Sequence, residues 1–127
     1  MKTTIASMMT SPARCVEMDD TVQTVEAFMN EHQLSWVPVR EPGGALVGTI
    51  SAADLLQFHA QRKDAASVPA WQICSYKPLA VAPEASVGEV AKTMLDQKAH
   101  HVVVKEADRL LGVVSSFDFV REFVAPR

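Results

Sequence analysis

One stretch of the chain decides its fold: Gly48-Thr49-Ile50-Ser51-Ala52-Ala53-Asp54-Leu55-Leu56. A second copy follows later in the chain: Gly112-Val113-Val114-Ser115-Ser116-Phe117-Asp118-Phe119-Val120. Each copy begins with β-branched residues, which are typical of a strand. Each then has a serine followed three residues later by an aspartate, a spacing that is typical of a helix start. The pattern therefore predicts a strand that leads directly into a helix, at two places in the chain.

The rest of the chain repeats at almost the same interval. Residues 86–94 match residues 21–29, and His101–Val104 match Trp36–Val39 at that same interval. The interval between the two signature copies is shorter by a single position, because the second hairpin has lost one residue. A repeat that covers nearly the whole chain indicates two copies of one small unit. We expect residues 1–62 to form the first repeat, 63–72 a linker, and 73–127 the second repeat.

Each repeat is expected to contain an extended segment, a helix, a strand, a turn, a second strand and a second helix. In residues 21–32 the apolar side chains recur at helical spacing. The turn signal Glu41-Pro42-Gly43-Gly44 separates two apolar runs and predicts a hairpin. One repeat alone has too little core to be stable. We therefore expect an α/β (α+β) fold in which two pseudo-symmetric β-α-β-β-α repeats pack sheet to sheet, with the signature copies flanking the cleft between them.

Composition excludes several classes of protein. Hydrophobic residues make up 48% of the 127 residues, which is typical of a globular chain and not of a disordered one. The net charge of −3 disfavours nucleic-acid binding, which usually requires a basic face. No apolar run has the length of a membrane span or of a signal peptide. The two cysteines, Cys15 and Cys74, could pair on count alone, but free thiols are the better interpretation. We expect a soluble protein of the cytoplasm.

The ordered set of motifs resembles the cystathionine-β-synthase-type (CBS) repeat. The set is Met-Thr-x-Pro at 9–12, an apolar helix, Val-Pro-Val at 37–39, and then Gly-x-x-Ser-x-x-Asp-Leu. The resemblance covers about residues 5–60 and 70–125, and the tandem is similar to a CBS pair, or Bateman module. It implies a regulatory module that senses AMP, ADP, ATP or another adenosyl ligand such as S-adenosylmethionine. It also implies a homodimer of four repeats, with an effector protein as the regulated partner.

The signature itself has chemistry that suits a nucleotide. A helix N-terminus presents unpaired N–H groups and a partial positive charge to a phosphate, and Ser51 or Ser115 adds a hydroxyl there. The carboxylate of Asp54 or Asp118 can accept hydrogen bonds from both hydroxyls of a ribose. The resemblance implies two sites, each completed by residues of the other repeat. The first combines Ser51 and Asp54 with Val81, His100, His101 and Val103; the second combines Ser115 and Asp118 with Thr10, Val16, Ser35, Trp36 and Pro38.

Structural interpretations compete with these functional ones. The same Ser-x-x-Asp spacing forms a capping box, which satisfies the helix's own N–H groups without a ligand. His101 either contacts phosphate when it is protonated or is a strand-start residue without a role. Trp36 either stacks on a base or belongs to the core or to a dimer contact. Phe117 and Phe119 flank Asp118 and make the two sites unequal, so we expect ligand at Asp54 first.

No set of residues indicates catalysis. The sequence has no nucleophile–base pair and no P-loop. No metal site is expected, because adjacent histidines on a strand point to opposite faces and no other ligand is spaced to join them. We therefore expect a binding module that is not an enzyme and requires no cofactor. The alternative is a dimerisation or interaction scaffold in which side chains fill the clefts.

Overall fold

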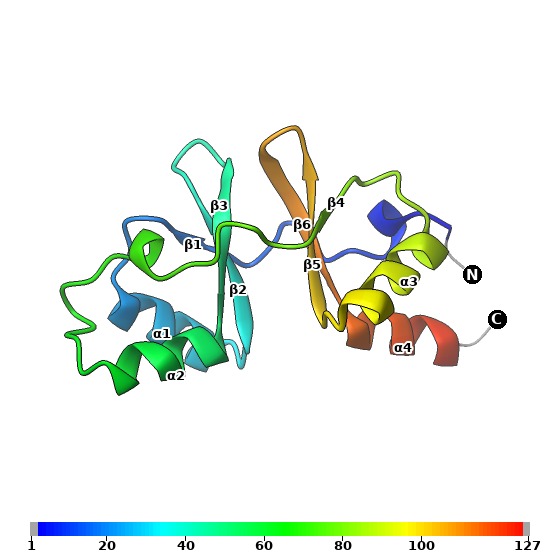
Figure 1. Cartoon of the computed structure of the whole chain (residues 1–127). Coiled ribbons are helices and arrows are strands. Elements are labelled where there is room, and N and C mark those ends of the chain that lie inside the picture. The colour runs from blue at the N-terminus through cyan, green and yellow to red at the C-terminus, as the bar shows by residue number, and fades with distance from the viewer. Residues whose placement is uncertain (1–2, 126–127) are drawn as a thin grey trace. The chain divides into compact units, whose positions relative to one another are not determined.

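The computed structural model describes residues 3–125. They form two compact units, each with one sheet and two α-helices (Figure 1). Arg14–Pro78 is the first unit, and Met1–Ala13 together with Leu79–Arg127 is the second unit. The predicted mixed α/β fold, with one order of strands and helices written twice, is confirmed.

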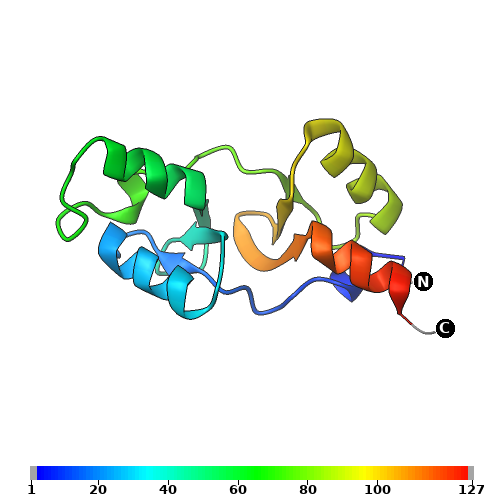
Figure 2. The same ribbon diagram turned by 90° about the horizontal axis from the view of Figure 1, so that it is seen from below.

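The first unit contains the elements of the first half of the chain. Its helices lie on one side of its sheet, as Figures 1 and 2 show. The sheet has the order β1-β2-β3, with β1 parallel to β2 and β2 antiparallel to β3. The elements in chain order are β1 (Val16–Glu17), α1 (Val22–Glu31), β2 (Trp36–Arg40), β3 (Leu46–Ser51), α2 (Ala52–Ala60) and the 3₁₀ turn η2 (Ala70–Gln72).

The second unit repeats this plan. Its sheet has the order β4-β5-β6, again with one parallel and one antiparallel pair. Each of its helices also lies on the same side of the sheet (Figure 2). The elements in chain order are the 3₁₀ turn η1 (Ile5–Ser7), β4 (Ala80–Val81), α3 (Val87–Gln97), β5 (His101–Glu106), β6 (Arg109–Ser115) and α4 (Ser116–Val124).

The helices α1 and α3 are equivalent in the repeat, and residues at matching positions cap their N-termini and form their buried faces. Thr21 caps α1 by accepting a hydrogen bond from the Thr24 N–H at 3.1 Å, and Ser86 caps α3 by accepting one from the Glu89 N–H at 3.1 Å. The buried residues then follow with helical spacing, which gives each helix one core-facing side. They are Val22, Val25 and Met29 in α1, and Val87, Val90 and Met94 in α3. Each helix thus contributes to the core of its own unit.

The two units exchange their opening segments. Residues before Arg14 belong to the second unit, whereas residues up to Pro78 belong to the first. Ile5 of η1 is fully buried in the core of the second unit, and Ala70 of η2 is fully buried in the core of the first. The compact units are thus bounded differently from the repeats in the sequence, and the boundaries 1–62, 63–72 and 73–127 stay a prediction about the repeats.

Candidate functional site

The first signature copy forms the junction between β3 and α2. Ser51 Oγ accepts a hydrogen bond from the Asp54 N–H at 3.2 Å, and Asp54 Oδ2 accepts one from the Ser51 N–H at 2.8 Å. Both residues are half-buried. This reciprocal pair is the capping box that the spacing predicts. It uses one carboxylate oxygen of Asp54, and no hydrogen bond to the other, Oδ1, is found within residues 3–125.

The second copy forms the junction between β6 and α4 and carries a capping box of the same kind. Asp118 Oδ2 accepts hydrogen bonds from the Ser115 N–H at 2.7 Å and from Ser115 Oγ at 3.2 Å. Asp118 Oδ1 is paired with the guanidinium of Arg121. Both carboxylate oxygens are therefore engaged at this junction. The two copies share a backbone arrangement but differ in what their carboxylates contact.

The first strand of each hairpin lies beside the junction of its own unit. Trp36 is directly opposite Ser51 in the β2–β3 ladder, and His101 is directly opposite Ser115 in the β5–β6 ladder. The preceding carbonyls bind the helix starts: Ser35 O accepts from the Ala52 N–H at 2.8 Å, and His100 O accepts from the Ser116 N–H at 2.9 Å. The structure thus brings Trp36 to Ser51 and His101 to Ser115. The predicted combination of His101 with Asp54 joins residues of different units and stays a prediction.

The electrostatics of His101 follow from this position. Burial lowers the pKa of the His101 imidazole, the neighbouring His100 lowers it further, and the Asp118 carboxylate opposes both effects. The lowered pKa favours the neutral imidazole at neutral pH. A contact with phosphate through protonated His101, as the sequence predicts, would therefore need the phosphate itself to favour the charged form.

The exchanged opening segments lie against the strands that lead into the junctions. Thr10 exchanges backbone hydrogen bonds with Val113 at 2.9 and 3.1 Å, and Ser75 exchanges them with Thr49 at 2.8 and 3.0 Å. The glycine of each signature copy makes room for this approach. A Cβ on Gly48 would lie 2.2 Å from the Ser75 carbonyl oxygen.

Ser75 lies beside the first junction and is absent from the residues that the sequence predicts there. It occupies the position in the first unit that Thr10 occupies in the second, because each forms an isolated bridge to the equivalent strand residue. The two residues are also equivalent in the sequence repeat, which could have identified Ser75. Arg121 was missed as well, because the signature ends before it.

The remaining predicted residues are strand residues of the two sheets. Val16 pairs with Val39 and Pro38 with Thr49 in the first unit, whereas Val81 pairs with Val104 in the second. Val16, Pro38 and Val103 are buried, and Val81 is half-buried. Of the predicted set, the first unit holds Ser51, Asp54, Val16, Ser35, Trp36 and Pro38, and the second unit holds Ser115, Asp118, Thr10, Val81, His100, His101 and Val103.

Both cysteines lie in the first unit. Both are free thiols; Cys74 is buried in the core, and Cys15 is half-buried. Burial is the largest effect on both and raises the pKa of each thiol. Within residues 3–125, no three His, Cys, Asp or Glu side chains are grouped so as to hold a metal ion. Across the same residues, every helix is too short or too polar to cross a bilayer.

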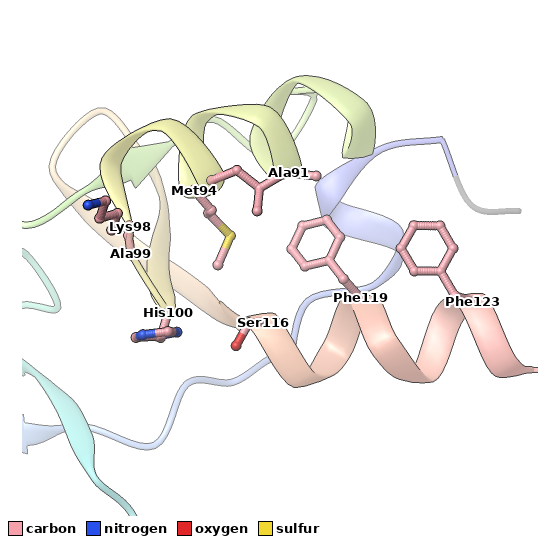
Figure 3. A pocket seen from close by; sticks show the side chains of 9 residues that line it. Ala91, Met94, Lys98, Ala99, His100, Ser116, Phe119 and Phe123 are labelled. Atoms are coloured by element: carbon pink, nitrogen blue, oxygen red, sulfur yellow. The ribbon is translucent and has the colours of Figure 1, made fainter.

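An apolar groove lies between α3 and α4 of the second unit (Figure 3). Its volume is about 560 Å³. Lys98 and His100 lie at one end and Phe123 at the other, as Figure 3 shows. The lining residues are Ala91, Met94, Leu95, Lys98, Ala99, His100, Ser116, Phe119 and Phe123. Of the two phenylalanines that flank Asp118 in the sequence, Phe119 packs into the core and Phe117 is 61% exposed.

The first unit has a polar pair where the second has this groove. His59 Nε2 of α2 and Glu26 Oε2 of α1 are joined by a hydrogen bond of 2.7 Å. The repeat places Ala91 of α3 at the position of Glu26, and Phe123 of α4 at the position of His59. The two helix pairs therefore present chemically different surfaces.

Comparisons with curated proteins find relatives that match almost the whole chain. The CBS domain-containing protein CBSX3, mitochondrial, of Arabidopsis thaliana is 29% identical over 134 residues, covering 96% of this chain and 65% of the relative. Inosine-5'-monophosphate dehydrogenase of Mycobacterium bovis is 29% identical over 126 residues, covering 95% of this chain and 22% of the relative. The chain thus spans less than two thirds of the length of each.

Solved structures share the fold. A protein from Vibrio cholerae described as an acetoin utilization protein (AcuB) has a TM-score of 0.90 at 24% identity, covering 98% of this chain and 92% of that one. CBSX2, solved in complex with AMP, has a TM-score of 0.84 at 21% identity, with coverage of 97% of both chains. The CBS domain of a bacterial CNNM/CorC family Mg²⁺ transporter, solved in complex with ATP, has a TM-score of 0.82 at 25% identity, covering 98% and 89%.

The family follows from the match of the repeats themselves. The CBS domain family matches residues 5–60 and residues 70–125, which together are most of the 127 residues. The same two segments carry the repeated order of strands and helices and the two capped junctions. The chain therefore belongs to the CBS domain family and carries two CBS domains in tandem.

Proposed function

We propose that the chain is a regulatory module that binds an adenine nucleotide or another adenosyl ligand at its strand-to-helix junctions and catalyses no reaction. The observation that carries the proposal is the Ser51–Asp54 junction. Its capping box uses Asp54 Oδ2 and leaves Oδ1 without a hydrogen bond among residues 3–125. A carboxylate oxygen in this state can accept from a ribose hydroxyl, while the start of α2 favours a phosphate.

Two of the similar structures support the choice of ligand. One was solved with AMP and another with ATP, and these two ligands share the adenosine group. The ribose diol is the part of that group that a free carboxylate oxygen recognises. S-adenosylmethionine carries the same diol and belongs to the ligands to be tested. The dehydrogenase activity of the mycobacterial relative is not assigned to this chain, which spans 22% of that protein.

Thermal unfolding with added ligand tests the proposal. A ligand that binds only the folded chain raises the melting temperature to an extent set by its affinity and concentration. We expect AMP, ADP or ATP at millimolar concentration to raise it, and Asp54→Ala to remove the part of the rise that comes from the first junction. The absence of a rise with every adenosyl ligand would exclude the proposal.

The second candidate function is that of an interaction scaffold, and the groove between α3 and α4 favours it. Phe123 of α4, which lines the groove, is 61% exposed, and the next residue of α4, Val124, is 74% exposed. Exposed apolar patches of this kind mark interaction sites. We propose that the chain forms a homodimer through this face, because α4 supplies side chains that protrude and the groove beside it supplies a space that can receive them. Dimerisation and ligand sensing are compatible in one module.

The first unit offers a matched control for the dimer. Changing Ala91→Glu and Phe123→His gives the second unit the residues that form the Glu26–His59 pair in the first. We expect this double variant to be monomeric at a concentration at which the wild type is dimeric, by analytical ultracentrifugation.

In the cell, we propose that the module acts in the cytoplasm and transmits ligand binding to an effector protein.

A further inference from the structure

The second junction contains an internal cation that the first junction lacks. The guanidinium of Arg121 pairs with Asp118 Oδ1 and lies over the ring of Phe117, with 5.1 Å from its central carbon to the ring centroid. The side chain of Asp118 is 11% exposed and that of Arg121 is 62% exposed. With Arg121 packed against it, the Asp118 carboxylate is therefore almost buried.

The equivalent residues of the first junction cannot form this arrangement. When the two signature copies are aligned, Gln57 stands where Arg121 stands, and Ala53 stands where Phe117 stands. Glutamine carries no charge, and alanine offers no ring to hold a guanidinium. Within residues 3–125, Asp54 has no ion pair. The same motif thus occurs once with a carboxylate that has no ion pair among these residues, at Asp54, and once with a carboxylate that is paired with an arginine, at Asp118.

The difference changes what each junction can bind. A ribose diol needs a carboxylate oxygen that is free to accept its hydroxyl protons. Asp118 Oδ2 is used by the capping box and Oδ1 by Arg121. A ligand at this junction must first displace the guanidinium from both the carboxylate and the ring of Phe117.

We propose that Arg121 is a specificity-determining residue that closes the second junction by occupying Asp118, so that the adenosyl ligand binds preferentially at Asp54. The proposal rests on the proposed function, because it concerns the same kind of site. Displacing an exposed ion pair together with a cation–π contact weakens binding by about tenfold. Occupancy of the second junction then requires a ligand concentration about ten times higher than the first.

Single-junction variants test the proposal, with ATP as the probe and its dissociation constant as the measurement. In Asp54→Ala, only the second junction can contribute a ribose acceptor, and we expect the dissociation constant to rise by about tenfold. In Asp54→Ala with Arg121→Gln, the second junction has the glutamine of the first, and we expect the constant to return toward the wild-type value.

The outcomes separate this inference from the proposed function. Wild-type affinity in Asp54→Ala would overturn the inference, as would a double variant that binds ATP no better than Asp54→Ala. Failure of the wild type to bind ATP, AMP or S-adenosylmethionine would overturn the proposed function itself. If Asp54→Ala does not fold, the reverse transplant that follows tests the inference in a chain that keeps Asp54. The reverse transplant, Gln57→Arg with Ala53→Phe, is expected to weaken ATP binding to the otherwise unchanged chain.

Discussion

The carbonyl oxygen of Ser75 lies 2.2 Å from the position that a Cβ on Gly48 would occupy. The whole of α2 separates the two residues in the sequence, and Ser75 belongs to the opening segment of the other repeat. Backbone hydrogen bonds between Ser75 and Thr49 hold the segment there. The same relationship recurs in the second unit, where a Cβ on Gly112 would lie 2.7 Å from the Thr10 carbonyl oxygen. The glycine of each signature copy is therefore required by the structure, because a side chain at this position would clash with the backbone of the exchanged segment.

This contact predicts that Gly48→Ala destabilises the chain. The added methyl group meets backbone, which cannot move aside as a flexible side chain can, so we expect a loss of about 1–3 kcal/mol or more in the free energy of unfolding. Urea denaturation measures it. Gly88→Ala is the matched control, because the added methyl group in α3 would meet no atom within 4 Å apart from its chain neighbours and the backbone of its own helix. The control is expected to be neutral or stabilising by up to about 1 kcal/mol. Equal effects of the two changes would contradict the argument.

The capping boxes predict a modest cost for removing either aspartate. Asp54→Ala removes one hydrogen bond to the Ser51 N–H, and we expect a loss of about 0.5–2 kcal/mol in the free energy of unfolding. Asp118→Ala also removes the contact with Arg121, but that residue is 62% exposed, so little is added. Asn at either position keeps a capping oxygen and should restore most of the loss. A cost well above this range would mean that the carboxylates hold more of the structure than the caps.

His101 predicts a loss of stability in acid. Burial and the neighbouring His100 lower the pKa of folded His101 below its usual value near 6.5, with Asp118 opposing them. As pH falls below about 6.5, the unfolded chain takes up a proton that the folded chain does not, so the free energy of unfolding decreases until the lowered pKa is passed. Well above pH 6.5, His101 is neutral in both the folded and the unfolded chain, so it adds no pH dependence to the free energy of unfolding.

Denaturation of the wild type and of His101→Gln at pH 8 and at pH 5.5 measures this effect. The wild type should lose more stability between the two values than the variant does. His100→Gln is an intermediate control, because it removes one of the causes that lower the pKa of His101. An identical pH dependence in the wild type and in His101→Gln would contradict the prediction.

We predict that both thiols react slowly with thiol reagents. Burial raises the pKa of both Cys15 and Cys74, so little thiolate is present at neutral pH. We expect Cys74, which is 8% exposed, to react with a thiol reagent much more slowly than a free cysteine, and Cys15 to react at an intermediate rate. Cys74→Ala and Cys15→Ala assign the two rates. Full denaturation should make both thiols react rapidly.

Local patterns in the sequence were sufficient to predict the helices and strands and their order along the chain. The apolar spacing of Val22, Val25 and Met29 predicts α1, and the caps at Ser51 and Ser115 predict the starts of α2 and α4. These predictions hold because neighbouring residues determine them. The register that places Trp36 opposite Ser51 and His101 opposite Ser115 also follows the repeat.

Contacts between distant segments could not be derived in this way. Nothing in the local sequence around Thr10 or Ser75 indicates which strand each will join, so the exchange of opening segments was not predicted. The pairing of Arg121 with Asp118 depends on side-chain placement one turn into α4, beyond the signature. The contact between Glu26 and His59, and the apolar lining that Ala91 and Phe123 provide in the second unit, depend on which side chains of two packed helices face each other.

The central claim is that the chain binds an adenosyl ligand through Asp54. The most direct test is the melting temperature of the wild type and of Asp54→Ala with and without ATP at millimolar concentration, each protein being compared with its own ligand-free value. We predict a clear rise for the wild type and a much smaller rise for the variant. An unchanged melting temperature of the wild type with ATP, AMP and S-adenosylmethionine alike would contradict it.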